Sequence, residues 1–214
     1  MGRMKLPNTP SIRRMPTYLH KLMLLRAQGE AFVSAPKLAD YMNLDSIVVR
    51  KDLELTDIKG QPGVGYDTHR LIEAIRRFLG WDAPCRACLI GAGSLGSALL
   101  GYEEFAEYRM QICGVFDIDS AKIGTCVHGH EILDAKEMSA WVRREKPDVA
   151  ILCVPSAYAQ RVTDELVDCG VRAFWNFANV SLQVPEEVVV QREVIAGGFA
   201  MLSVKMAHRG IKDG

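Results

Sequence analysis

No apolar run in this sequence is long enough to cross a membrane. A spanning helix needs roughly 20 apolar residues, and polar residues interrupt every apolar stretch before that length. The polar amino-terminal stretch also lacks the apolar core of a signal peptide. We therefore expect a cytoplasmic protein with no membrane partner.

The sequence also lacks the ligand spacing of a metal site. Its six cysteines lie mostly inside apolar stretches, which favours buried free thiols over a disulfide framework. Cys85 and Cys88 form a CxxC pair, but no second pair completes a zinc site, and Cys88 enters an expected strand. His128 and His130 stand in a glycine-flanked turn without a third ligand. We expect no metal and interpret the CxxC pair as a structural coincidence, with a thiol or metal role as the less favoured alternative.

The net charge of zero conceals an uneven distribution of charge. Residues 1–80 carry 13 basic and 8 acidic side chains, while residues 81–214 carry 13 and 18. The first 26 residues contain six basic side chains and no acid. A basic amino-terminal module suggests a polyanion partner, although a basic solvated face fits the charge equally well.

Helix signals follow one another through the basic half of the chain. A first helix is expected over residues 16–28, with Pro16 at its start. Ser34 is the expected N-cap of a second helix, and Asp45 is the expected N-cap of a third over residues 46–53. The tight connection between the second and third predicts a helix-turn-helix.

The pattern of apolar residues predicts which faces of these helices are buried. Tyr41 is expected on the buried face of the second helix, and Ile47 and Val48 on that of the third. Arg50 and Lys51 would then project outward.

Glycine and proline mark a turn after the helix-turn-helix. The segment 59–66 holds three glycines around Pro62, which suits a β-hairpin and therefore a wing beside the third helix. A further helix is expected over 69–79, followed by a linker at 81–84. This order of elements is that of a winged helix, and the predicted boundary lies near residue 82.

The next hundred residues alternate between apolar strands and helices. Strands are expected over 87–90, 111–116, 149–154 and 172–176, with helices between them and only a turn region between 117 and 134. Such alternation indicates a buried parallel sheet of the Rossmann type. The tail adds a strand-like segment at 188–190 and an apolar helix over 196–206 that needs a partner surface.

A glycine loop follows the first of these strands and opens a helix. Its sequence is Gly91-Ala92-Gly93-Ser94-Leu95-Gly96. In this context Gly91 makes the tight turn, Gly93 lets a phosphate approach the backbone, and Gly96 permits close helix packing. The helix start supplies amide donors for the pyrophosphate of a dinucleotide.

Asp117 ends the next strand, 26 residues after Gly91. An acid there can accept hydrogen bonds from the adenosine ribose, which favours NAD+ or NADH over their 2′-phosphorylated forms. Lys122 is close in sequence but follows the acid. The alternative for Asp117 is a simple turn residue.

No catalytic group accompanies the dinucleotide motif. A hydride-transfer enzyme adds a substrate domain with an acid or base, yet only about 30 residues follow the last expected strand. A small NAD-dependent dehydrogenase or a CoA-binding protein, with residues 1–80 as an oligomerisation module, stays the main alternative. An adaptor with a degenerate Rossmann core is a third.

Both halves together resemble the Rex family of redox-sensing transcriptional repressors. The resemblance runs from about Pro16 to Met206, and it is the shared order of the motifs that makes it specific. The motifs are Val49-Arg50-Lys51-Asp52-Leu53, Gly63-Val64-Gly65-Tyr66, the glycine loop with Tyr102 following, Phe116-Asp117-Ile118-Asp119, Val154-Pro155, Asn176-Phe177 and Val184-Pro185.

The resemblance implies a homodimer that catalyses no reaction. A winged helix over 1–82 would bind a palindromic operator in double-stranded DNA, and a Rossmann domain over 83–190 would bind NADH or NAD+. A carboxy-terminal helix within 191–214, which includes Phe199, would be exchanged between the two chains. NADH would stabilise a closed dimer that no longer fits the operator.

The same resemblance assigns residues to both ligands. The DNA contacts would be Ser46, Arg50, Lys51, Lys59, Gly63 and Tyr66. Val154, Pro155, Asn176 and Phe177 would join the glycine loop, Asp117 and Lys122 at the cofactor.

Several positions depart from the family pattern. Pro62 replaces a basic residue of the wing, Ser94 replaces an Asn or Arg of the loop, and Asn179 stands where a proline is typical. The family switch pairs Tyr102 with an Arg of the first helix and an Asp before the exchanged helix. His20 and Val194 occupy those positions by ungapped counting, with Glu193 one residue away, so either Glu193 serves through a shifted register or the switch is altered. In the first case we expect His20 and Glu193 to form a pH-sensitive pair.

Overall fold

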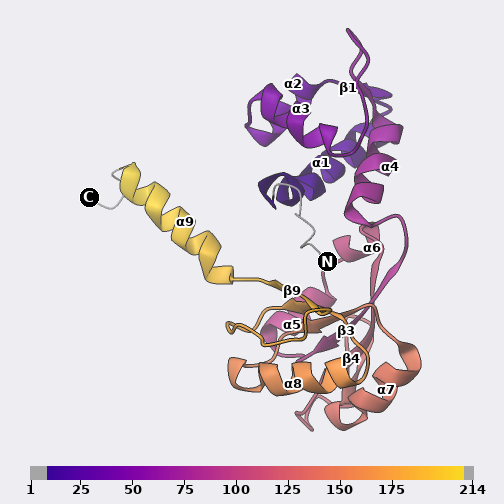
Figure 1. The fold of residues 1–214 in the computed structure, drawn as a ribbon, viewed down its shortest axis with the longest axis vertical. Helices are drawn as coiled ribbons and strands as arrows, with labels where there is room; N and C mark the ends of the chain where they lie inside the picture. The colour runs from indigo at the N-terminus through magenta and orange to yellow at the C-terminus, as the bar shows by residue number, and fades with distance from the viewer. Residues whose placement is uncertain (1–8, 210–214) are drawn as a thin grey trace. The chain divides into compact units, whose positions relative to one another are not determined.

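Two units make up the computed structural model, which describes residues 9–209. The first ends at Pro84 and the second begins at Cys85 (Figure 1). The basic residues Arg3 and Lys5, counted above for the amino-terminal charge, lie outside the described residues.

Four helices form the body of the first unit. Their bounds are α1 (Thr9–Ala27), α2 (Ala35–Met42), α3 (Ser46–Glu54) and α4 (Thr68–Leu79). The side chains of Ser34, Asp45 and Asp67 cap α2, α3 and α4 by accepting hydrogen bonds from first-turn amides. Both caps predicted from the sequence, Ser34 and Asp45, are confirmed.

The first helix does not begin at Pro16, as the sequence suggested, because Pro16 lies inside α1. A proline removes one backbone hydrogen bond and usually breaks a helix. Here one continuous face is buried on both sides of it, formed by Ser11, Met15, Tyr18, Leu19, Leu22 and Leu25. Burial of that face offsets the lost bond.

Two side chains that were predicted to face the core are exposed instead. Ile47 is 56% exposed and Tyr41 is 43% exposed, whereas Val49 is fully buried in α3. Val48 is half-buried. In a helix as short as α3, a shift of two residues in the buried face is decided by the neighbouring helices rather than by the apolar pattern.

A small antiparallel sheet forms the wing. β1 (Phe32–Val33) pairs with β2 (Tyr66–Asp67), and a bridge between Gln61 and Gly65 closes the hairpin before β2. Gly65 has a positive φ, and a Cβ there would lie 2.4 Å from the carbonyl oxygen of Val33. Only glycine therefore lets the hairpin pack against β1.

A seven-stranded sheet organises the second unit, as far as the structure describes it, in the order β5-β6-β4-β3-β7-β8-β9. Every pair except β5 with β6 is parallel. This is the doubly wound order, in which the direction of winding reverses between β3 and β7. The strands are β3 (Cys85–Ile90), β4 (Met110–Asp117), β5 (Cys126–Val127), β6 (His130–Asp134), β7 (Val149–Leu152), β8 (Ala173–Asn176) and β9 (Val189–Arg192).

Helices cover both faces of this sheet. These helices are α5 (Ser94–Leu100), α6 (Glu104–Glu107), α7 (Met138–Glu145) and α8 (Ser156–Asp168), with a short 3-10 turn at Ala135–Glu137. A further helix, α9 (Ile195–His208), follows β9 and has no buried residue among those described. Cys88 and Ile90 pack with residues of α7 and α8, while Ala87 and Leu89 pack with residues of α5. The alternation along β3 places one apolar cluster on each face.

The second unit differs from the expectation in three places. The segment 117–134, expected as a turn region, contains β5 and β6. The expected strand 149–154 ends at Leu152. β9 extends to Arg192, so the expected boundary between residues 190 and 191 falls inside a strand.

Candidate functional site

The glycine loop lies where the winding of the sheet reverses. Gly91 follows β3 with φ +97°, and a Cβ there would lie 2.8 Å from the carbonyl oxygen of Cys153, which follows β7. A Cβ on Gly96 would lie 2.0 Å from the carbonyl oxygen of Gly91. Gly91 and Gly96 are therefore fixed by close backbone packing.

Gly93 differs from the other two glycines because a Cβ on it would meet no atom within 4 Å. Gly93 is the N-cap of α5, and no side chain caps that first turn. The open face and the free first-turn amides fit an approaching phosphate. The crevice at such a reversal point is where doubly wound sheets bind their ligands.

The carboxylate of Asp117 ties the loop to β4. Its Oδ2 accepts a hydrogen bond from the Ala92 amide (2.8 Å), and its Oδ1 accepts one from the Asp119 amide (2.9 Å). Burial would raise the pKa of Asp117, but the amides and the Lys122 charge hold the pKa below its usual value. Asp117 is thus both the turn residue and the anchor of the loop. Sequence reasoning missed its contact with Ala92, although Asp117 ends β4 and Ala92 follows the adjacent parallel strand β3.

Lys122 is engaged by two acids. Its Nζ lies 3.3 Å from Asp117 Oδ2 and 3.7 Å from Asp119 Oδ2. The three groups leave a net negative charge beside Ile118, whose side chain is 79% exposed. This charge would repel a ribose 2′-phosphate, so the electrostatics favour an unphosphorylated ribose.

Val154 and Pro155 continue the chain after β7, so they stand beside the Gly91 turn at the same edge of the sheet. Pro155 is the N-cap of α8, and no side chain caps that helix either. Burial raises the pKa of the neighbouring Cys153 thiol to about 12. Cys153 is therefore a neutral thiol and not a nucleophile.

Asn176 and Phe177 stand at the same edge, after β8. The Asn176 side chain is fully buried, accepts a hydrogen bond from the Ala178 amide and donates one to the Val180 carbonyl. It therefore builds the turn after β8. The half-buried Phe177 ring packs on Trp175, with 5.0 Å between the ring centroids.

The expected switch residues occupy distinct settings. Tyr102 donates a hydrogen bond to Glu104 (2.8 Å), which also accepts one from Tyr108. Glu193 accepts from the indole of Trp175 (3.4 Å) and from Gln191. Val194 is the exposed N-cap of α9, and Phe199 on α9 is 71% exposed. His20 lies half-buried on α1, in the other unit.

The residues expected to contact DNA lie on α3 and on the wing. Arg50, Lys51 and Lys59 are exposed, and Ser46 is half-buried at the start of α3. Gly63 has a positive φ at the hairpin tip. Burial raises the pKa of the wing residue Tyr66, and the positive charge of Arg50 on α3 opposes this rise.

A buried ion pair fixes α3 against α1. Arg14 contacts both carboxylate oxygens of Asp52, at 2.6 and 2.8 Å, and the Tyr18 hydroxyl donates to the same group. Asp52 is 1% exposed. Sequence reasoning did not identify this pair. Its signal is an acid beside Val49 and Leu53 on the buried face of α3.

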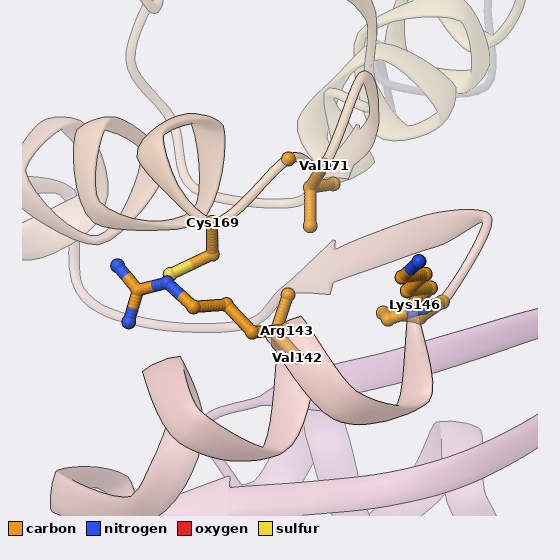
Figure 2. Close-up of a pocket in the computed structure, with 7 residues that line it drawn as sticks. Val142, Arg143, Lys146, Cys169 and Val171 are labelled. Atoms are coloured by element: carbon orange, nitrogen blue, oxygen red, sulfur yellow. The ribbon is translucent and has the colours of Figure 1, made fainter.

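A hollow in the second unit lies away from the glycine loop. It has a volume of about 230 Å³ and lies between the end of α7, with Arg143 and Lys146, and the turn after α8, with Cys169 and Val171 (Figure 2). These segments precede β7 and β8, so the hollow is at the amino edge of the sheet. Its lining offers no carboxylate to pair with the basic groups.

Residues 9–209 contain no cluster of three or more metal-ligating side chains. No helix in this range is long and apolar enough to cross a membrane.

Comparisons with known proteins match both units of the chain. A family model described as a CoA binding domain matches residues 82–180, and one described as a putative DNA-binding protein N-terminus matches residues 5–54. The redox-sensing transcriptional repressor Rex of Treponema denticola is 44% identical over 96% of this chain and 98% of that protein. Rex of Bacteroides thetaiotaomicron is 35% identical over 95% of this chain and 92% of that protein.

Solved structures give the same result. RSP, a Rex-family repressor, in complex with β-NAD+ and operator DNA has a TM-score of 0.86 at 29% identity, covering 97% of this chain and 96% of that one. RSP in complex with β-NADH has a TM-score of 0.84 at 28% identity, covering 97% and 98%. With relatives of this similarity over nearly its whole length, the chain belongs to the Rex family of redox-sensing transcriptional repressors.

Proposed function

We propose that this chain represses transcription by binding a palindromic operator as a homodimer, and that NADH binding releases the DNA while NAD+ permits binding. The observation that carries the proposal is one chain that joins a helix-turn-helix and wing to a glycine loop at the reversal point of a doubly wound sheet. RSP has been solved with both dinucleotides and with operator DNA. Operator binding implies a cytoplasmic location.

The dinucleotide would lie along the carboxyl edge of the sheet. The open face of Gly93 and the amides of Ser94 and Leu95 would hold the pyrophosphate. Asp117 keeps acceptor capacity for a ribose hydroxyl beyond the hydrogen bonds that it receives from Ala92, Asp119 and Lys122. Val154, Pro155 and Phe177 would line the nicotinamide end, with Asn176 shaping the turn that carries Phe177.

The operator would be bound by the first unit. Arg50 and Lys51 on α3 would reach base edges or phosphates in the major groove. Lys59, Gly63 and Tyr66 of the wing, with Ser46 at the start of α3, would contact the backbone or the minor groove. We propose that the part up to Pro84 binds DNA, that the part from Cys85 to the end of β9 at Arg192 binds the dinucleotide, and that the part after β9 forms the dimer.

The dimer would form through α9. None of its described residues is buried, although Ile195, Phe199, Met201, Leu202 and Val204 are large apolar side chains. An exposed apolar helix of this kind needs a covering surface. The exchange of α9 between two copies supplies one.

The test is operator binding with three ligand states. A palindromic duplex selected from a random pool by the purified protein is titrated by fluorescence anisotropy with NAD+, with NADH and with neither. We expect NADH to weaken binding at least tenfold, about 1.4 kcal/mol. Equal affinity in all three states would contradict redox control. In the same samples, loss of NADH absorbance with a carbonyl substrate would indicate a dehydrogenase instead.

A variant of the function is favoured by one observation. Val194 is an exposed apolar residue where the family switch has an acid, and Glu193 already has partners in Trp175 and Gln191. The protein would then bind both ligands with weak or inverted coupling. NADH-induced release in Glu193→Ala at the wild-type level would show that Glu193 takes no part in the switch.

A further inference from the structure

Four aromatic rings form a continuous ladder through the second unit. Tyr102 contacts Phe105 with 4.9 Å between ring centroids, Phe105 contacts Trp175 at 5.8 Å, and Trp175 contacts Phe177 at 5.0 Å. The first two contacts are edge-to-face. All three distances fall in the range of favourable aromatic pairs.

The two ends of the ladder lie at different functional places. Phe177 follows β8 at the carboxyl edge of the sheet, where the nicotinamide is proposed to bind, and its amide donates to the Leu152 carbonyl. Tyr102 follows α5 and is 44% exposed. The ladder thus runs from the proposed cofactor crevice to an exposed tyrosine.

Tyr102 is held at two points. Its ring edge rests on the buried Phe105, and its hydroxyl donates to Glu104, which also receives the hydroxyl of Tyr108. A displacement of Phe105 therefore changes the position of Tyr102 relative to Glu104. A packed ring cannot shift without moving its neighbours, because protein interiors have few voids.

Trp175 gives the ladder a branch. Its indole Nε1 donates to Glu193 Oε1 at 3.4 Å, and the Glu193 amide donates to the Asn176 carbonyl. Glu193 stands two residues before α9 (Ile195–His208). Trp175 therefore contacts Phe105, Phe177 and the segment that leads into α9.

We propose that Trp175 is a positioning residue that couples the occupant of the nicotinamide end to Tyr102 and to the start of α9. The inference rests on the proposed function and goes further by naming the residues that link the nicotinamide end to Tyr102 and to α9. NADH and NAD+ differ in the shape and charge of the nicotinamide ring, so they press differently on Phe177. The ring of Trp175 passes that difference to Phe105 and Glu193.

The test compares Trp175→Leu with Trp175→Phe in the full-length protein. For each variant, NADH affinity is measured by NADH fluorescence, and operator affinity by anisotropy with NAD+, with NADH and with neither. We expect Trp175→Leu to keep ligand-free operator affinity and NADH affinity within about threefold, while NADH-induced release falls at least fivefold. Trp175→Phe keeps a ring in the ladder and should retain most of the release.

Trp141→Leu is the matched control. Trp141 is also half-buried and packs edge-to-face on Phe116 at 5.4 Å, but it belongs to the cluster on the other face of the sheet. It should lose stability without losing NADH-induced release. If Trp175→Leu does not fold, Phe105→Leu interrupts the same ladder at the next contact.

The outcomes separate the two proposals. Absence of NADH-induced release in the wild type would overturn the proposed function. Release in the wild type and equal release in Trp175→Leu would overturn the role of Trp175 alone. Equal defects in Trp175→Leu and Trp141→Leu, or in Trp175→Leu and Trp175→Phe, would also overturn it, because the effect would then not follow the rings.

Discussion

At the scale of single residues, the three glycines of the loop serve different purposes. Gly91 and Gly96 are required by the fold, because a Cβ on either would meet backbone atoms. Gly93 has an ordinary negative φ of −74° and open space around it. Its lack of a side chain therefore matters only to a ligand.

This difference predicts opposite results for two alanine substitutions. Gly93→Ala should leave the unfolding free energy within about 0.5 kcal/mol of the wild type, because the new methyl group meets no protein atom. It should weaken NADH binding at least tenfold, because the methyl group keeps the pyrophosphate from the backbone. Gly91→Ala should cost roughly 2 kcal/mol of stability. Thermal unfolding and NADH titration check both, and unchanged NADH affinity in Gly93→Ala would place the pyrophosphate elsewhere.

The buried Asp52 makes the first unit sensitive to acid. Burial would raise the pKa of Asp52, but hydrogen bonds from Arg14, Ser11 and Tyr18 and the charge of Arg14 hold the pKa below the usual 3.8. A lowered pKa in the folded state means stability that is present above the unfolded pKa and lost as the pH falls through the folded pKa.

Asp52→Asn should therefore cost about 2 kcal/mol at neutral pH, because Arg14 keeps its charge without a partner. The difference in unfolding free energy between wild type and variant should close as the pH falls below about 4. Urea unfolding of both proteins over a pH series measures this difference. A gap that stays constant down to about pH 3 would show that the carboxylate charge of Asp52 does not stabilise the fold.

At the scale of elements, α3 has a buried and an exposed face. Val49, Asp52 and Leu53 are buried, while Arg50 and Lys51 are exposed. The ion pair to Arg14 fixes the rotation of α3 and hence the direction of its basic side chains. The proposed DNA contacts of Arg50 and Lys51 would therefore depend on Asp52, which is buried on the opposite face of α3.

Arg50→Ala should weaken operator binding about tenfold or more, because one base or phosphate contact is worth roughly 1–3 kcal/mol. It should also flatten the dependence of binding on salt concentration. Arg77→Ala, which removes the same charge from an exposed position on α4, is the matched control. Equal effects from both substitutions would indicate a general charge effect rather than a recognition contact.

At the scale of the whole molecule, α9 has no covering surface within the described part of a single chain. Its apolar side chains are exposed along the entire helix, and none of its described residues is buried. A free helix of this composition is unfavourable in water, which supports the proposed dimer. The stability of the protein is then tied to its concentration.

Phe199→Glu should convert the proposed dimer to a monomer, because it places a charge where the partner copy would cover an apolar side chain. Sedimentation velocity measures the change. Val64→Glu introduces the same charge at an exposed apolar residue of the wing and should leave the protein dimeric. A dimeric Phe199→Glu would place the interface outside α9.

The sequence predicts a feature correctly where a residue contacts backbone within a few positions of itself. Ser34 and Asp45 cap their helices, and the glycine loop follows β3, because capping and tight turns depend on backbone within a few residues. The pair β5 and β6 was missed because it is short and partly polar, without a strand's alternation. The prediction for Ile47 is wrong for a different reason, because neighbouring helices decide which face of α3 is buried.

The sequence by itself determined the order of elements, the glycine loop and the resemblance to a family, because these are written in residues close together in the chain. Only the tertiary structure decided what joins distant segments. It set the contact of Asp117 with Ala92, the pair of Arg14 with Asp52, and the ladder from Tyr102 to Phe177. Each brings together groups that no local pattern relates, so the packing of the whole sheet or helix bundle has to exist before the contact does.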